Sequence, residues 1–278
     1  MYALAPAPRG DIVASSHQVR PTSHDFPVIN DPKQGEREYF ARIGPEGIRH
    51  SLTKPFGDEF CTQYLAQLTA LFGLIAPPTA RIANFGCGTG WLSLVLAQRG
   101  YEVQGVDISE DAIRAAQAAA QERGLPNANF VAHDYESFDG REQFDYCVFF
   151  DALHHAESEL NALRCAHAAL KPGGCAITFE PGSGHSRAES SLRAVEQFHV
   201  HEKDMPPSHI VKVARVAGFR RHLVLPHPYQ LNRRVYRRAY HRATSPADLQ
   251  GRRWLGVLRS VWQLLRWRSD PGLVVLWK

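Results

Sequence analysis

The most constraining stretch of this chain is a glycine-rich turn between a short apolar run and a segment of helical periodicity. Residues 82–85 are typical of a buried strand, and Gly86-Cys-Gly-Thr-Gly90 follows them directly. Residues 91–99 then carry apolar side chains at helical spacing. Glycines in such a turn let the backbone approach a ligand closely, and the first amides of the following helix point into the same crevice. The stretch therefore predicts a strand–turn–helix ligand site.

A second strand is predicted over residues 101–106, and Asp107 closes it. A carboxylate at this position can accept hydrogen bonds from the hydroxyl pair of a ribose. The fingerprint of dinucleotide-binding proteins, G-x-G-x-x-G, requires a small residue where the helix packs on the strand. Here the spacing is G-x-G-x-G and the next residue is Trp91. This argues against a pyrophosphate site and favours another nucleoside-containing ligand.

At this point the chain resembles the class I S-adenosylmethionine-dependent methyltransferases, whose first motif is an acidic or polar residue followed by G-x-G-x-G. Further motifs of that family follow in its order: residues 130–134 ending in Asp134, residues 144–151 before Ala-Leu-His154-His155, and Leu-Lys-Pro-Gly-Gly at 170–174 before a strand at 175–179. The resemblance covers residues 79–225 and a final strand at 273–277. It implies an α/β fold with a Rossmann-like seven-stranded sheet, mostly parallel with an antiparallel last strand.

The resemblance also implies the cofactor, S-adenosyl-L-methionine, with S-adenosyl-L-homocysteine as product. In the family the third-strand carboxylate, here Asp134, contacts the adenine amino group. Asp151 is expected either to contact the methionine part of the donor or to orient a histidine. Asn84 stands where the family usually has an acid, and it brings no charge to the ligand. The predicted cofactor residues are Asn84, Gly86, Cys87, Gly88, Gly90, Asp107, Ile108, Asp134, Tyr135 and Asp151.

The order of predicted elements gives an independent reason to place these residues together. Strands and helices alternate from residue 82 to residue 179, which indicates a parallel sheet with helices on both faces. Ligands of such sheets bind at the carboxyl ends of the strands. The strand-end residues share this edge: Gly86, Asp107, Asp134, Asp151 and Glu180.

Methyl transfer from a sulfonium mainly requires binding and orientation, and a weak nucleophile also requires a base. We predict His154 as that base, then His155, with Glu180 contacting the substrate. The alternatives are that either histidine bonds backbone and that Glu180 forms a salt bridge. Cys87 is expected to serve the turn rather than act as a nucleophile. No metal is predicted, because adjacent histidines rarely point at one ion.

The chain is expected to divide into an N-terminal arm and helical cover, residues 1–78, and a core, residues 79–278. The segment 39–51 mixes aromatic residues, arginine and histidine without a clean apolar face. It is either a lid over the cofactor or a packing strap. The predicted substrate and lid residues are Tyr39, Phe40, His50, Phe56 and, on the loop after the fifth strand, His185.

The connection at residues 226–270 is longer than a simple link between strands requires. It carries ten arginines, and Asp248 is the only acid before its end at Asp270. Such a stretch is a solvated basic face, a site for an acidic substrate, or an anionic membrane contact through residues 252–268. Its apolar stripe leaves homodimerisation open. Nucleic acid is disfavoured, because no known RNA-binding module accompanies the core.

Composition narrows the remaining classes. The net charge of +4 is too small to indicate nucleic-acid binding by itself. The five cysteines form no C-x-x-C pair, so neither a zinc site nor a disulfide framework is predicted. A signal pattern and a membrane-spanning run are not recognised, and we expect a cytoplasmic protein. The predicted function is methyl transfer to oxygen or nitrogen of a small molecule or glycan. The alternatives are non-methylating chemistry on the same cofactor and a non-catalytic ligand-binding homologue.

Overall fold

The structure is a computed structural model that describes residues 31–76, 79–233, 258, 262 and 272–278. The described residues belong to one compact unit, 31–278. All structural statements that follow concern these residues.

The centre of the unit is a seven-stranded sheet in the order β3-β2-β1-β4-β5-β7-β6. Strands β1 to β5 are parallel, and β7 runs antiparallel to both of its neighbours, β5 and β6. The predicted mostly parallel sheet with an antiparallel last strand is thus confirmed. The strands are β1 (Arg81–Phe85), β2 (Glu102–Asp107), β3 (Ala128–Ala132), β4 (Phe144–Phe150), β5 (Leu170–Phe179), β6 (Arg221–Pro226) and β7 (Gly272–Trp277).

Helices cover both faces of the sheet. Side chains alternate between the two faces along each strand, so each strand packs against helices on both sides. Ile82 of β1 packs with one set of helices, whereas Ala83 and Phe85 pack with the other. The first set comprises α2 (Cys61–Leu74), α3 (Trp91–Gln98) and the C-terminal half of α4 (Glu110–Glu122); the second comprises α5 (Glu159–Ala169) and α7 (Pro207–Ala217). This two-sided burial is what makes β1 and β4 almost wholly apolar.

Local signals set several helix starts. Ser109 is the N-cap of α4, and its hydroxyl accepts a hydrogen bond from the amide of Ala112 at 3.4 Å. Ser158 caps α5 through the amide of Asn161. Gly90 has φ of 80° at the N-cap of α3, a conformation that favours glycine and turns the chain from the strand into the helix.

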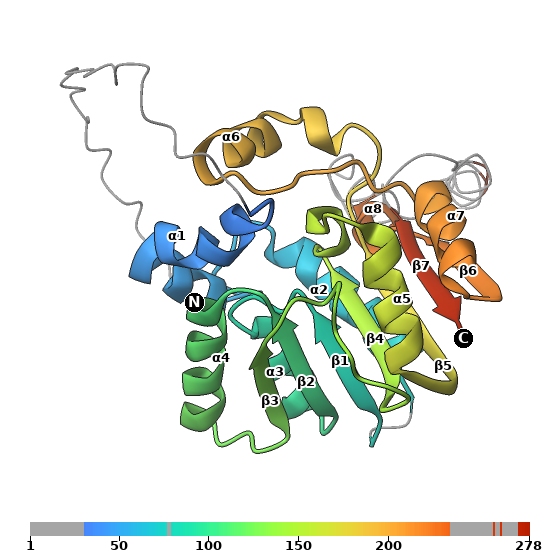
Figure 1. Cartoon of the computed structure of the whole chain (residues 1–278), viewed down its shortest axis with the longest axis horizontal. Helices are drawn as coiled ribbons and strands as arrows, with labels where there is room; N and C mark the ends of the chain where they lie inside the picture. Colours follow the sequence, from blue (N-terminus) through green and yellow to red (C-terminus); the bar gives the residue numbers. More distant parts are fainter. Residues whose placement is uncertain (1–30, 77–78, 234–257, 259–261, 263–271) are drawn as a thin grey trace, which may run out of the picture. The chain divides into compact units, whose positions relative to one another are not determined.

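Two further helices lie beyond the carboxyl ends of the parallel strands (Figure 1). They are α1 (Gln34–Leu52) and α6 (Glu189–Phe198). Helix α1 is kinked at Gly44-Pro45, since Gly44 has φ of 67°, and it continues to Leu52. Helix α1 packs against α4 and α6, so it bridges the start of the core and the segment after β5. The division of the chain at residue 78 stays a prediction.

Little of the connection after β6 is described. Helix α8 (Pro228–Asn232) packs on α2, where Gln67 Nε2 and His227 Nε2 lie 3.1 Å apart. The expectations for the arginine-rich segment, the membrane contact at 252–268 and the dimer stripe fall outside the described residues. Within the described part of the chain, no helix has the length and apolar character needed to cross a membrane.

Candidate functional site

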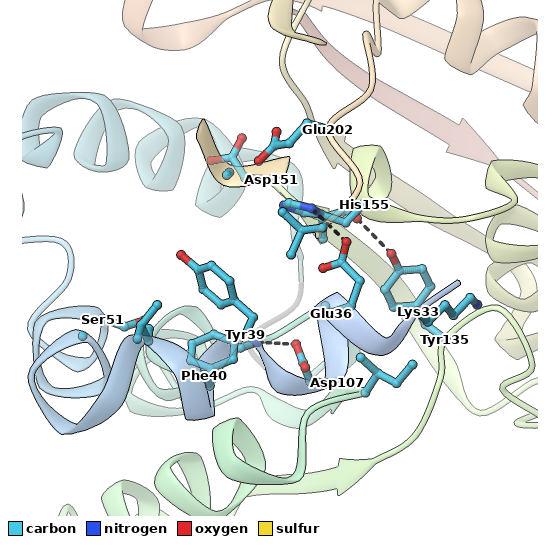
Figure 2. Close-up of a pocket in the computed structure, with 18 of the residues that line it drawn as sticks. Lys33, Glu36, Tyr39, Phe40, Ser51, Asp107, Tyr135, Asp151, His155 and Glu202 are labelled. Atoms are coloured by element: carbon cyan, nitrogen blue, oxygen red, sulfur yellow. Dashed lines mark hydrogen bonds and ion pairs between the residues drawn. The ribbon is translucent and has the colours of Figure 1, made fainter. Parts of the chain in front are cut away.

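A cavity of about 440 Å3 lies at the carboxyl ends of the strands. Its floor comes from the ends of β1, β2, β3 and β4, and its roof from α1, α6 and the loop before α7. Figure 2 shows side chains from both sets of elements pointing into the same space. The cavity therefore joins the predicted strand-end residues to a helix from the N-terminal segment.

The glycine turn forms one end of the cavity. Gly86 and Gly88 line it with φ of 68° and 53°. A side chain on Gly86 would meet the Cβ of Ala152 at 2.6 Å, so only glycine fits there. Asp107 accepts hydrogen bonds from the amides of Gly88 at 2.7 Å and Ser109 at 2.9 Å. Burial raises the pKa of this carboxyl, and the two amides oppose the rise.

Three predicted cofactor residues do not line the cavity. Asn84 is buried, and its amide donates to the Ser93 hydroxyl at 2.9 Å. Cys87 is buried under the turn, where burial raises the pKa of its thiol, and Gly90 makes room for the ring of Phe130. All three are buried around the turn and support it from behind.

The third-strand end forms the next part of the cavity. Asp134, Tyr135 and Ile108 line it as predicted. Lys33, which the sequence did not single out, contacts Asp134 at 2.6 Å and Glu136 at 2.7 Å. These two carboxylates raise the pKa of Lys33, although burial alone would lower it. The residue before α1 is thus bound to the predicted adenine edge of the site.

Helix α1 covers the cavity along its length. Tyr39, Phe40 and His50 line the cavity, as the lid hypothesis predicts. The Phe40 ring lies directly over Gly88, where an added Cβ would come within 3.0 Å of it. Phe56 is 79% exposed and lies outside the cavity lining, since the chain turns away after the helix.

Glu180 organises the short helix η1 (Leu153–His155) from beneath the cavity. Its carboxylate accepts hydrogen bonds from the backbone amides of Ala152, Leu153 and His154. It also lies 2.7 Å from His154 Nδ1. Burial raises the pKa of Glu180 to about 7. Neither Glu180 nor His154 lines the cavity, so the structure gives both a supporting position rather than the predicted contact with the acceptor.

His154 and His155 are adjacent in sequence but differ in environment. Burial and the charge of His155 hold the pKa of His154 well below its ordinary value, so that ring is neutral. His155 lines the cavity, and its Nδ1 lies 3.5 Å from Glu36 Oε1. Burial acts to lower the pKa of His155, but the Glu36 carboxylate outweighs it and raises the pKa to about 9.

Two more acidic groups complete this end of the cavity. Glu202 lines it and holds His185 Nε2 at 2.5 Å, which places His185 behind Glu202 rather than in the lining. Asp151 lines the cavity from a strained turn with φ of 50°. Burial of the cavity floor, together with the Glu180 charge, raises the pKa of Asp151 to about 7. A carboxyl with this pKa can exchange a proton with a bound molecule near neutral pH.

Three residues of the lining, Lys33, Glu36 and Glu202, were not predicted from the sequence. Glu36 and Lys33 stand at the start of a helix that was itself predicted, and Glu202 lies in an irregular polar segment. No local pattern shows what such side chains meet, because their partners are distant in the chain. One group of metal-ligand type also occurs among the described residues, with ligand atoms of His154, His155 and Glu202 within 4.8 Å of one another.

Comparison with known proteins identifies the family. Residues 82–174 match the family model of a methyltransferase domain. This match, with the relatives below, supports a class I S-adenosylmethionine-dependent methyltransferase. The recognition from sequence and the cofactor, S-adenosyl-L-methionine, are thereby confirmed. The match covers the glycine turn, Asp107, Asp134 and the two histidines, and it leaves out α1 and the segment after β5.

Individual relatives match this chain only in part. A ubiquinone biosynthesis O-methyltransferase of Ralstonia nicotianae is 31% identical over 50% of this chain and 62% of that protein. An S-adenosyl-L-methionine-dependent Diels-Alderase of Talaromyces variabilis is 36% identical over 37% of each chain. The chain thus spans less than two thirds of these relatives' length. A phosphoethanolamine N-methyltransferase of Haemonchus contortus, solved with S-adenosyl-L-methionine, shares the fold at 19% identity and a TM-score of 0.56, over 88% of this chain and 58% of that one.

The residues at the glycine end of the cavity fit this cofactor. Gly86 and Gly88 leave the space that side chains would fill, and backbone can approach a ligand closely there. Asp107 and Asp134 each present a carboxylate at neighbouring strand ends, the arrangement that suits a ribose and an adenine amino group. These residues would hold the nucleoside part of the cofactor.

Proposed function

We propose that this methyltransferase transfers a methyl group to an oxygen or nitrogen of a neutral small molecule or glycan, with a hydroxyl as the favoured acceptor. The observation that carries the proposal is the continuity of one cavity. The predicted nucleoside-binding residues at one end share this cavity with Asp151, His155 and Glu202 at the other. The O-methyltransferase relative supports an oxygen acceptor.

S-adenosyl-L-methionine supplies a methyl group already activated on a positively charged sulfur. The acceptor oxygen forms the new bond to that methyl group, and the electron pair of the broken carbon–sulfur bond stays on sulfur. The hydroxyl proton must leave, and we assign its acceptance to His155, which lines the cavity while His154 does not. Asp151, whose pKa of about 7 lets it accept a hydrogen bond or a proton near neutrality, is the second candidate.

The charges that line the cavity support a neutral acceptor. Among the described residues, Lys33 and Lys54 are the lysines and arginines of the lining, and both lie near carboxylates. Six carboxylates line the same space: Glu36, Asp107, Asp134, Glu136, Asp151 and Glu202. A phosphorylated acceptor would meet these acids without a free lysine or arginine to bind it. A hydroxylated acceptor can donate hydrogen bonds to them instead.

Product analysis tests the proposal. The protein is incubated with S-adenosyl-L-methionine and a panel of phenols, catechols, free sugars, amines and sugar phosphates, and products are identified by mass spectrometry. We expect S-adenosyl-L-homocysteine together with a methylated phenol or sugar. Methylthioadenosine without methylated product would overturn the proposal in favour of other chemistry on the cofactor. Retained S-adenosyl-L-homocysteine binding with no product across the panel would favour a cyclase-type or non-catalytic protein instead.

A further inference from the structure

Helix α1 brings the carboxylate of Glu36 to the ring of His155, the proposed base. Glu36 stands in the first turn of α1 and is largely buried. Its Oε1 accepts a hydrogen bond from the amide of His201 at 2.7 Å and lies 3.5 Å from the Nδ1 atoms of both His155 and His201. Figure 2 shows Glu36 reaching up from α1 to the ring of His155. A single carboxylate thus connects the cover, the β4 end and the loop before α7.

The buried ring nitrogens make this contact necessary. The Nδ1 atoms of His155 and His201 are inaccessible to water and have no hydrogen-bond partner among the described residues apart from their ion-pair contact with Glu36. A buried polar nitrogen without any partner is costly. Glu36 offers a negative charge to both, and the positive end of α1 favours a carboxylate in its first turn.

The geometry points to Glu36 as a positioning residue that holds the imidazole of His155, so that the proton-accepting site is complete only while α1 is seated over the cavity. This inference rests on the proposed function in taking His155 as the base. With Nδ1–H held by Glu36, the other ring nitrogen is left to take a proton from the acceptor. The carboxylate then stabilises the imidazolium that forms. Closure of the cover and activation of the base become one event.

The groups around His155 agree with this role. Burial disfavours a charge on His155, and the His154 ring lies 4.1 Å away between centroids. Glu36 is the largest influence in the opposite direction, and its own pKa falls to about 2 through His155 and His201 despite its burial. The other ionisable groups that act on or lie beside His155 are Asp107, Asp151, Glu180, His201 and Glu202.

The test replaces Glu36 by its neutral isostere and measures the titration of His155 by NMR on histidine-labelled protein, with His155→Gln to assign the signal. We expect Glu36→Gln to lower the pKa of His155 by about 1–3 units, the usual effect of removing one close opposite charge. The control is Glu38→Gln, which removes an exposed carboxylate of the same helix that pairs with Arg42. It should leave the titration unchanged. An unshifted His155 in a folded Glu36→Gln protein would overturn the inference.

A kinetic measurement separates a positioning role from a structural one. Once an acceptor is found, the wild-type turnover rate should rise with pH up to the titration of His155. In Glu36→Gln the midpoint should move to lower pH and the plateau should fall about tenfold, because a weaker base transfers the proton less well. In a His155→Gln background, Glu36→Gln should have little further effect. Additive losses would contradict the inference.

Two safeguards keep the test decisive. If Glu36→Gln does not fold, Glu36→Asp keeps the charge with a shorter reach, and it should give a pKa between those of wild type and ordinary histidine. If the pKa of His155 in Glu36→Asp equals that of the wild type, the inference is contradicted. Failure of the proposed function has a separate sign, since the wild type would then yield no methylated product while the NMR titration still reports whether Glu36 controls His155.

Discussion

The two ends of the cavity are built in different ways. The glycine end, which we propose binds S-adenosyl-L-methionine, is called the donor end. It consists of strand ends that are neighbours in one sheet, with glycines whose backbone conformation leaves room for a ligand. The opposite end, which we propose binds the methyl acceptor, is called the acceptor end. It consists of α1, the β4 end and the loop before α7, and its contacts are mostly between charged side chains. The first end depends on backbone geometry and the second on ionisation. Substitution of a donor-end residue should thus act on affinity, whereas the acceptor end should respond to pH.

The largest effect is expected at the donor end. Asp107→Ala should weaken S-adenosyl-L-homocysteine binding by about a hundredfold or more. It removes the two charge-assisted hydrogen bonds expected with the ribose hydroxyls, each of about 1.5–3 kcal/mol. Titration calorimetry measures this. Since Asp107 also binds the amides of Gly88 and Ser109, Asp107→Asn and a thermal melt serve as controls for the turn. Unchanged affinity in a folded Asp107→Ala protein would remove Asp107 from the site.

A smaller effect is expected at the acceptor end, on rate rather than affinity. His155→Gln should lower the turnover rate by about a hundredfold and leave donor affinity nearly intact. His154→Gln is the matched comparison, because its ring lies behind the cavity against Glu180. His154→Gln should mainly lower the melting temperature, since the buried carboxylate of Glu180 loses its partner. If His154→Gln alone abolished turnover in a stable protein, the base would have to be assigned to His154.

The free energy of unfolding should depend on pH through His155 and Glu36 at the acceptor end. The pKa of His155 in the folded protein, about 9, lies above its unfolded value, so its contribution is complete below about pH 6.5 and is lost as pH rises through 9. Glu36 is lowered to about 2, so its contribution is complete above about pH 4.5 and is lost as pH falls through 2. The free energy of unfolding should fall by about 2 kcal/mol between pH 6 and pH 10. In Glu36→Gln, this fall should largely disappear from denaturant titrations.

Asp151 should behave in the opposite sense. Its folded pKa of about 7 is raised, so the ionised carboxylate destabilises the fold increasingly from about pH 4 and fully above pH 7. Asp151→Asn should raise stability at pH 8 by about 1 kcal/mol, less than the full shift implies because cavity water screens the charge. It should have no effect near pH 4. The same variant should lose turnover if Asp151 contacts the acceptor. A destabilised Asp151→Asn protein at pH 8 would contradict this account.

The smallest effect concerns the cover itself. If α1 closes over the donor, S-adenosyl-L-homocysteine should slow amide exchange in residues 34–52 several-fold, because closure opposes local opening. Helix α5, on the far face from the glycine turn, provides the internal control. Lys33→Gln should speed exchange in α1, since it removes the contacts with Asp134 and Glu136. Equal exchange with and without ligand would favour a fixed packing strap.

Sequence alone predicted the donor end and a mostly parallel sheet. Residues 82–107 show a buried strand, a glycine turn, a helix and an acid at a strand end, and each signal is local. Short-range backbone rules fix such units, and the alternation of strands and helices brings their ends to one edge.

Only the tertiary structure decided the acceptor end. His154 and His155 are indistinguishable in the sequence, but one ring bonds Glu180 beneath the cavity and the other lines the cavity beside Glu36. Glu36 and His155 are brought together by the packing of α1 over the sheet edge, and no local pattern encodes that contact. The charge of each histidine depends on burial and on partners far away in the chain. Sequence therefore predicted where a donor would bind, and the fold decided which of the two histidines lines the cavity.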